Sequence, residues 1–304
     1  MLALPDYLDR IGLGRFAPPV DSRVCELCGA GGAVSIRASV RVDADLNAAF
    51  VTRCCVRCGL LYQSQKFARG FYQAYYAQAY RRSLGAGGPS EAYVDDQHTR
   101  GESLHSALAP WLPRRGRLLD VGCGAGGMML AFREQGWRVR GSEPDLVAAS
   151  YAVERLGLDV VAASAERMAL EAGMFDLVII TGSLEHVYDT SAVLRRCHAA
   201  AAPESLLLLE AHGLGQAAYC GAIGHNHRRL LTANTLALLM LRHGWSPVWI
   251  TDQPLSGPSR PGSVFALGRR SIRPLRGAVA AAIGRGVRDT PAAMAELLDR
   301  SGIA

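Results

Sequence analysis

The sequence predicts an α/β protein built on a doubly wound, mostly parallel sheet, with a small lobe on its N-terminal side. Three observations predict this fold class. Short apolar strands alternate with helical segments after Pro113, the first strand runs into the glycine-rich turn LLDVGCGAGG at 118–127, and two C-x-x-C-G units precede residue 60. Such alternation is typical of a sheet with helices on both faces, whose ligands lie at the carboxyl ends of the strands.

Length and composition limit the classes of protein. The chain has 304 residues, of which 49% are hydrophobic and 20% charged, so we expect a globular protein with one large domain and an appendage, or two domains. Its formal net charge is +6, and Lys66 is its only lysine. The arginines are scattered and form no basic, aromatic stripe, which makes a nucleic-acid partner unlikely by composition.

No segment suggests export or membrane insertion. The first ten residues, MLALPDYLDR, carry acidic side chains and lack the apolar stretch of a signal peptide. The leucine-rich run LLTANTLALLML at 230–241 is too short to span a bilayer. We therefore expect a cytoplasmic protein, in which eight cysteines are more consistent with metal binding than with disulfides.

Four cysteines share one spacing. Cys25 and Cys28 form the first C-x-x-C-G unit, and Cys55 and Cys58 form the second. Two such knuckles complete a tetrahedral four-thiolate zinc site, which leaves no open position for catalysis and would stabilise a small lobe over residues 1–66. Two alternatives remain: Cys54 in place of Cys55, or buried thiols without metal.

Tyrosines mark the next segment. In FYQAYYAQAYRR, residues Tyr72, Tyr76 and Tyr80 would share one face of a helix, directed either at a core or at a substrate. A glycine-rich loop at 83–90 and a helix at about 91–110 follow. We predict a tyrosine-rich helical linker or substrate lobe over 67–110 and, at the far end of the chain, a helical tail over 272–304.

The glycine turn alone leaves the nucleotide open. Gly122, Gly124 and Gly127 fit the dinucleotide pattern G-x-G-x-x-G, and Asp120 with the glycines up to Gly126 fits D-x-G-x-G-x-G. A carboxylate at the end of the second strand, Glu143, can hold a ribose in either case.

Three further blocks resemble one family. With the glycine turn, FDLVIITGSLEHV at 175–187, LLLLEAHG at 206–213 and GHNHRRLLTANTLALLMLRHGW at 224–245 resemble the class I S-adenosylmethionine-dependent methyltransferases. The resemblance covers about residues 95–270 and implies a seven-stranded, Rossmann-like sheet with a reversed last strand. We assign the methyltransferase domain to 111–271.

The resemblance also implies the cofactor site. Asp120 would orient the glycine loop and the methionine amine, Glu143 would hold the ribose, and residues after the third strand would edge the adenine. Many relatives carry Asp where this chain has Ser164. The S-adenosylmethionine-binding residues implied are Asp120, Gly122, Cys123, Gly124, Gly126, Glu143, Pro144, Ser164, Ala165, Ser183, Leu184 and His186.

Methyl transfer to a hydroxyl or a carbon acid needs a base near the cofactor. His186 follows a strand at its carboxyl end, and His225 and His227 lie where the chain would cross the same mouth. These histidines and Tyr76 are the candidate catalytic residues, and each histidine has a purely structural alternative.

The order of a zinc ribbon, a tyrosine-rich helix and a methyltransferase fold resembles bacterial enzymes that methylate nucleotide-linked sugars and related intermediates. In the sugar C-methyltransferases an N-terminal tyrosine and a Glu-His or His pair serve the substrate. Here Gly224 precedes His225 in place of Glu, so O-methylation stays open. We expect a small polar acceptor, most simply a nucleotide-linked sugar in carbohydrate biosynthesis.

Two other functions compete with this hypothesis. The ribbon can serve as a nucleic-acid reader, although its flanks are acidic at Asp21, Glu26, Asp43 and Asp45. The chain can also bind S-adenosylmethionine without catalysis. The sequence is compatible with a monomer or a homodimer.

Overall fold

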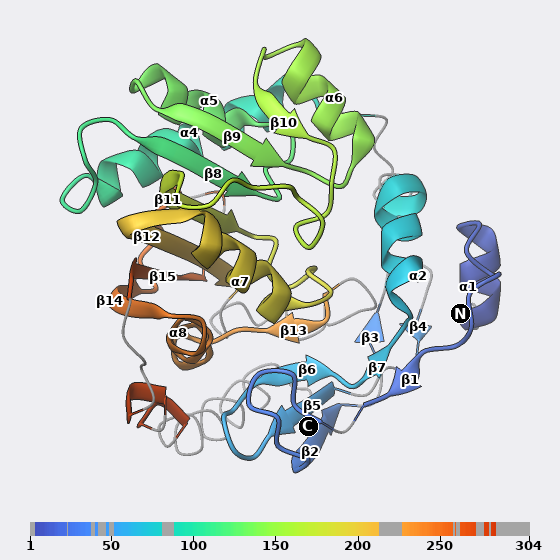
Figure 1. The fold of residues 1–304 in the computed structure, drawn as a ribbon. Helices are drawn as coiled ribbons and strands as arrows, with labels where there is room; N and C mark the ends of the chain where they lie inside the picture. The colour runs from blue at the N-terminus through green and yellow to red at the C-terminus, as the bar shows by residue number, and fades with distance from the viewer. Residues whose placement is uncertain are drawn as a thin grey trace.

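In this computed structural model, the described residues are 4–22, 24–37, 40–41, 47–48, 52–80, 88–212, 227–257, 259, 262–271, 277–279 and 281–283. The chain forms a large α/β unit with a smaller β-rich lobe beside it (Figure 1).

A seven-stranded sheet forms the centre of the large unit. Its strand order is β10-β9-β8-β11-β12-β15-β14, and β15 runs antiparallel to both of its neighbours, whereas the strands from β10 to β12 are parallel. This order confirms the predicted doubly wound sheet with a reversed last strand. The strands are β8 (Arg117–Val121), β9 (Arg138–Ser142), β10 (Asp159–Val161), β11 (Phe175–Thr181), β12 (Ala201–His212), β14 (Trp245–Thr251) and β15 (Ser263–Arg270).

Helices cover both faces of this sheet (Figure 1). Polar side chains begin several of them: Asp145 caps α6 by accepting from Val147 N at 2.9 Å, and Thr232 caps α8 by accepting from Thr235 N at 3.3 Å. The helices are α4 (Glu91–Leu108), α5 (Gly127–Glu134), α6 (Leu146–Glu154), α7 (Thr190–Ala200) and α8 (Ala233–Arg242).

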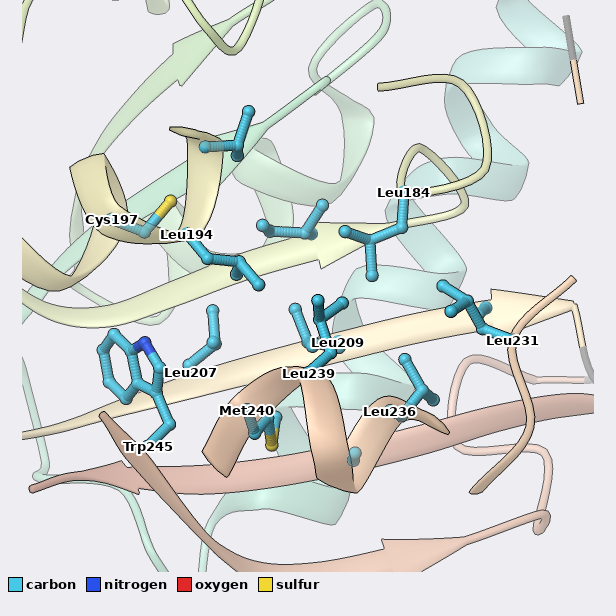
Figure 2. Packing of buried hydrophobic residues seen from close by; sticks show 14 of the residues in the cluster. Leu184, Leu194, Cys197, Leu207, Leu209, Leu231, Leu236, Leu239, Met240 and Trp245 are labelled. Carbon is cyan, nitrogen blue, oxygen red and sulfur yellow. The ribbon is translucent and has the colours of Figure 1, made fainter. Parts of the chain in front are cut away.

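The central strands are apolar on both faces because each face packs against helices. On β11, Val178 and Ile180 belong to one core and Leu177 and Ile179 to the other. The first core contains α7 and α8, and Trp245 closes it beside Cys197 (Figure 2). The second core contains α4 and α5. The uninterrupted apolar run of residues 177–180 follows from this double burial.

The N-terminal lobe contains a four-stranded sheet of order β13-β6-β5-β2, whose strands are β2 (Ala33–Arg37), β5 (Thr52–Cys55), β6 (Leu61–Gln63) and β13 (Arg229–Leu230). Three of these come from the front of the chain, but β13 comes from the segment between β12 and α8 and pairs with β6. Helix α1 (Leu4–Arg10) and two short strand pairs, β1 (Val20–Asp21) with β7 (Gln65–Lys66) and β3 (Val40–Arg41) with β4 (Asn47–Ala48), complete the lobe.

The tyrosine-rich segment is helical but changes its pitch. It begins as α2 (Arg69–Ala74) and continues as a π-helix, η1 (Tyr75–Ala79). Phe67 and Phe71 stack at 4.0 Å between ring centroids, and Tyr75 stacks on Phe71 at 6.2 Å. Aromatic packing therefore fixes this segment, and the Tyr76 ring packs against the same cluster.

The predicted tail at 272–304 lies mostly outside the described residues. Within it, Ala282 is buried and its carbonyl accepts from Asn234 Nδ2 at 3.0 Å. Most of the predicted loop at 83–90 also lies outside the described residues. Among the residues that the structure describes, no helix has the length and apolarity needed to cross a membrane.

Candidate functional site

A cavity of about 210 Å³ lies at the carboxyl ends of β8, β9 and β11, bordered by α2, η1 and α4. This is the edge at which the sequence predicted a ligand. Of the residues predicted to bind a cofactor, the following line it: Asp120, Gly122, Cys123, Gly124, Glu143, Pro144, Ser164, Ala165, Ser183 and His186.

The glycine turn brings main chain to the cavity wall. The amides of Gly122 and Cys123 donate to Ser142 O on β9 at 2.8 and 3.1 Å, and Gly124 N donates to Glu143 Oε2 at 2.8 Å. Gly124 has a φ of +58°, and a Cβ there would lie 2.9 Å from the Tyr93 hydroxyl. Only glycine fits between this turn and helix α4.

Two of the predicted cofactor residues lie off the cavity. Gly126, with a φ of +85°, begins α5 and packs against α6, where a Cβ would meet Leu158 Cδ1 at 2.5 Å. Leu184 points into the core next to Leu209 and Leu231 (Figure 2). Both residues shape the loops of the site, and neither residue lines the cavity.

Two carboxylates face the cavity side by side. Glu143 is held by main-chain amides, because Asp145 N donates to its Oε1 at 2.8 Å and Gly124 N to its Oε2. Burial and the charge of Glu143 raise the pKa of Asp120 to about 7, against the opposing charge of Arg100. The Oδ1 atom of Asp120 is buried and has no hydrogen-bond partner among the residues that the structure describes. The site therefore suits a ligand that brings donors and positive charge.

Arg100 also lines the cavity but already has a partner. Its Nη2 donates to Glu210 Oε2 at 3.1 Å, and both side chains are buried, with 4% and 1% of their surface exposed. Ser256 Oγ donates to the other Glu210 oxygen at 3.4 Å. Arg100 is thus held by Glu210 while its charge still acts on Asp120.

Tyr76 and His186 meet on the far side of the cavity. The Tyr76 hydroxyl lies 2.9 Å from His186 Nδ1. Burial, together with Tyr75 and Tyr80, raises the pKa of Tyr76 well above its usual range, so the phenol stays protonated beside the imidazole. Both side chains contact the same space as Asp120 and Glu143.

The other candidate histidines lie differently. His227 does not line the cavity, but its ring centroid is 4.5 Å from that of His186 and 5.9 Å from that of His212. His225 lies outside the described residues. His227 is thus placed to support the His186 ring from behind.

A buried acid next to His186 was not anticipated from the sequence. Glu185 Oε1 accepts from His212 N at 2.6 Å and lies 3.2 Å from His212 Nδ1. Burial alone would raise the pKa of Glu185, but the hydrogen bonds and charge of His212, with His186 nearby, lower it to about 2. Nothing in the spacing of Glu185 and His212 signals this contact between two strand ends.

Helix α4 contributes a polar face that the sequence analysis also missed. Tyr93, Gln97 and Arg100 line the cavity, and Gln97 Nε2 donates to the Tyr93 hydroxyl at 3.0 Å. Their spacing of four and three residues was the available signal, since it places them on one helical face. Tyr72, Tyr76 and Tyr80 likewise all reach the cavity.

The four cysteines of the two knuckles converge in the N-terminal lobe. The ligand atoms of Cys25, Cys28, Cys55 and Cys58 all lie within 4.8 Å of one another, and all four side chains are buried. The Sγ atoms of Cys25 and Cys58 are 3.6 Å apart, and those of Cys28 and Cys55 are 3.4 Å apart. Zinc–sulfur bonds of about 2.3 Å in a tetrahedron separate sulfurs by a little under 4 Å, so this set fits zinc.

The strand order, the reversed last strand and the glycine turn beside two carboxylates define a class I methyltransferase fold. A family model described as a methyltransferase domain matches residues 93–249, just over half of the chain, and the chain belongs to this family. The resemblance drawn from the sequence is thereby confirmed. The four clustered cysteines lie outside the matched residues.

Several curated proteins are similar to part of the chain. A ubiquinone biosynthesis O-methyltransferase from Pseudomonas aeruginosa is 35% identical over 115 residues, which are 35% of this chain and 49% of that protein. A protein of the same name from Methylocella silvestris is 34% identical over 38% of this chain and 49% of its own. The chain thus spans about half the length of the curated relatives it matches.

Among solved structures, the 1,6-didemethyltoxoflavin-N1-methyltransferase of Burkholderia thailandensis is similar in fold. It covers 77% of this chain and 99% of its own with a TM-score of 0.51 and 19% sequence identity. At this identity the likeness concerns the fold alone.

Proposed function

We propose that this protein is an S-adenosylmethionine-dependent methyltransferase that acts on an oxygen of a small polar acceptor. One observation carries the proposal: a single cavity joins the glycine turn and its two carboxylates to the Tyr76–His186 pair. A cofactor-binding half and a proton-accepting half therefore share one space.

The acidic half favours this cofactor over a dinucleotide. Asp120 has an oxygen without a partner and a pKa of about 7, raised by burial and by Glu143. A pyrophosphate placed there would add negative charge to two carboxylates. When bound, S-adenosylmethionine supplies a methyl group on a positively charged sulfonium, together with an ammonium and ribose hydroxyls that can donate to such groups.

The residues proposed to hold the cofactor follow from their place in the cavity. The turn at Gly122 and Gly124 borders the part of the cavity proposed for the carboxylate of the cofactor. Asp120 binds the cofactor's ammonium, and Glu143 binds its ribose. Ser164 and Ala165 border the adenine end. Gly126 and Leu184 are proposed to shape the loops of the site. A Cβ at Gly126 would point at Leu158, and the side chain of Leu184 lies in the core, so both are directed away from the cavity.

The aromatic half handles the acceptor proton. Tyr76 is a neutral phenol within hydrogen-bond distance of His186 Nδ1. With Nδ1 unprotonated, Tyr76 takes the hydroxyl proton of the acceptor while it passes its own proton to the imidazole. The proton then resides on His186, whose ring contacts His227. Tyr76 and His186 are the proposed catalytic residues, and His227 packs against the His186 imidazole.

The choice of oxygen and of acceptor class rests on two features. The curated relatives are named as O-methyltransferases, and the Tyr76–His186 pair offers a route for the proton that a hydroxyl acceptor releases. We retain a nucleotide-linked sugar as the first acceptor to test, because Arg69 lines the cavity, with its guanidinium over the Tyr188 ring, and can bind a phosphate. The names of the relatives point instead to a non-carbohydrate acceptor. The acceptor screen therefore also includes phenols.

We further propose that Cys25, Cys28, Cys55 and Cys58 bind a structural zinc ion. Their close, buried sulfurs fit four-thiolate coordination, which leaves no position for a reacting water. A nucleic-acid-reading role for this lobe has less support, because Glu26 between two of these cysteines faces Arg228 and Arg229 within the protein.

The function is tested first by calorimetric binding of S-adenosylhomocysteine, with NAD titrated in parallel. We expect binding of S-adenosylhomocysteine alone, weakened at least about tenfold in Glu143→Ala because buried charge-assisted hydrogen bonds are lost. Glu154→Ala, an exposed acid on α6, is the matched control and should bind as the unchanged protein does. Binding of NAD in place of S-adenosylhomocysteine would refute the proposal.

Cofactor affinity should depend on pH through Asp120. Its raised pKa of about 7 means that the carboxylate is largely protonated at pH 6 and ionised at pH 8. Because the ionised form attracts the ammonium group of the ligand, S-adenosylhomocysteine should bind up to about tenfold more weakly at pH 6 than at pH 8. Calorimetry on Asp120→Asn should give a flat profile over this range, and an equal slope in this variant would assign the effect to another group.

Removing one hydroxyl tests the aromatic half. Tyr76→Phe keeps the ring but removes the group that meets His186, so kcat should fall by about 100-fold or more while the KM for S-adenosylmethionine changes little. The assay follows S-adenosylhomocysteine release with the best acceptor from a screen of nucleotide-linked sugars and phenols. Tyr75→Phe, a ring packed on Phe71 away from the cavity, is the control. Equal losses in both variants would contradict the assignment.

The metal site predicts a link between zinc and stability. Cys58→Ser should lower bound zinc from about one ion per chain and lower the melting temperature, because the lobe loses its coordination. Cys197→Ser, a buried cysteine in α7, is the control that should keep its zinc. Metal analysis that finds no zinc in the unchanged protein would refute the site.

A further inference from the structure

The turn that carries His186 is held through its main chain. Residues 184–188 follow β11, and four of their five carbonyls accept hydrogen bonds from the far end of the chain or from Lys66. Arg229 Nη1 donates to Leu184 O at 2.5 Å and to Val187 O at 2.8 Å. Arg228 N donates to Glu185 O at 3.0 Å.

Three more hydrogen bonds, from the side chains of Arg228 and Lys66, complete this set of cationic contacts, here called the clamp. The Arg228 guanidinium donates to Val187 O and Tyr188 O, each at 3.0 Å, and Lys66 Nζ donates to Tyr188 O at 3.1 Å. Arg228 and Arg229 are buried, with 4% and 1% of their side chains exposed. Since the cations contact carbonyls on both sides of residue 186, they fix the direction in which that side chain leaves the turn.

All three cations converge on one carboxylate, Glu26. Arg229 Nε donates to its Oε1, Arg228 Nη2 lies 3.5 Å from its Oε2, and Lys66 Nζ lies 3.9 Å from the same oxygen. Buried guanidinium groups need such a counter-charge, and its removal leaves them uncompensated. The orientation of the clamp therefore depends on where Glu26 is held.

Glu26 is held by the first cysteine knuckle. It lies directly after Cys25 and two residues before Cys28, and the knuckle closes through Gly29 N, which donates to Cys25 O at 2.8 Å. Metal coordination by the two flanking thiolates would fix this short loop. A rigid path then runs from the four-cysteine site through Glu26 and the two arginines to the turn with His186.

We propose that Glu26 is a positioning residue through which the four-cysteine lobe sets the orientation of His186 toward Tyr76. The proposal rests on the proposed function for the importance of that pair. An ion pair that only joined the two lobes would need contacts between side chains alone. Here the arginines instead grip the main chain of the turn that supplies the proposed catalytic imidazole.

The experiment compares the zinc-loaded, full-length protein with Glu26→Gln and with Asp21→Asn. Asp21 pairs with Arg53 at 3.2 Å in the same lobe but has no described contact with the turn, so its variant is a matched control. The imidazole signals of His186 are followed by NMR on histidine-labelled protein and assigned through their loss in His186→Gln. His198 of α7, whose ring packs on Trp245, is the internal reference.

The expected result has three parts. Glu26→Gln keeps its zinc and its affinity for S-adenosylhomocysteine within about twofold, shifts the His186 signals but not those of His198, and lowers kcat about tenfold with little change in the KM for S-adenosylmethionine. Asp21→Asn leaves all of these unchanged. Unshifted His186 signals in a folded, zinc-loaded Glu26→Gln protein would overturn the proposal.

A second variant covers a failure to fold. Glu26→Asp keeps the charge but withdraws the carboxylate by one methylene, so it should fold and shift the His186 signals in the same direction as Gln, by a smaller amount. If neither variant folds, Glu26 supports the whole lobe and the specific positioning role is wrong. Absence of S-adenosylhomocysteine binding in the unchanged protein would instead refute the proposed function, while the NMR comparison would still decide the role of Glu26.

Discussion

The architecture depends on the burial of β11 and β12 from both sides. Their alternate residues feed two separate cores, so helices must cover both faces and each connection must return the chain to the start of the next parallel strand. As a consequence the parallel strands end at one edge. The glycine turn, Glu143 and the turn with His186 all lie there, although they are far apart in sequence.

Much of this arrangement could be predicted from the sequence because it depends on short-range patterns. The apolar runs, the glycine turn and the repeated cysteine spacing each report a local constraint, and strand alternation implies how they assemble. The prediction of the reversed last strand, β15, rested on the family resemblance. Pairings between distant segments carry no such pattern: β13 joining β6, Glu185 meeting His212, and Arg229 meeting Glu26 are visible only once the chain is folded.

Local patterns also fail where tertiary packing overrides them. The spacing of the tyrosines predicted a regular helix, but the segment widens into a π-helix at Tyr75–Ala79. The aromatic cluster around Phe71 packs against this segment, and Tyr72, Tyr76 and Tyr80 still all line the cavity. Gly126 and Leu184 each lie in a recognisable motif of the cofactor site. Both pack against other parts of the protein, and neither lines the cavity.

The pairing of β13 with β6 has a consequence for synthesis on the ribosome. The N-terminal sheet acquires its edge strand only after residue 230 has emerged, and Glu26 meets its arginine partner 203 residues later in the chain. Until Arg228 and Arg229 have emerged, a nascent N-terminal lobe therefore displays an open strand edge, and Glu26 has Lys66 but neither of its two arginine partners. Maturation of this lobe is a late event, coupled to completion of a domain that begins after it.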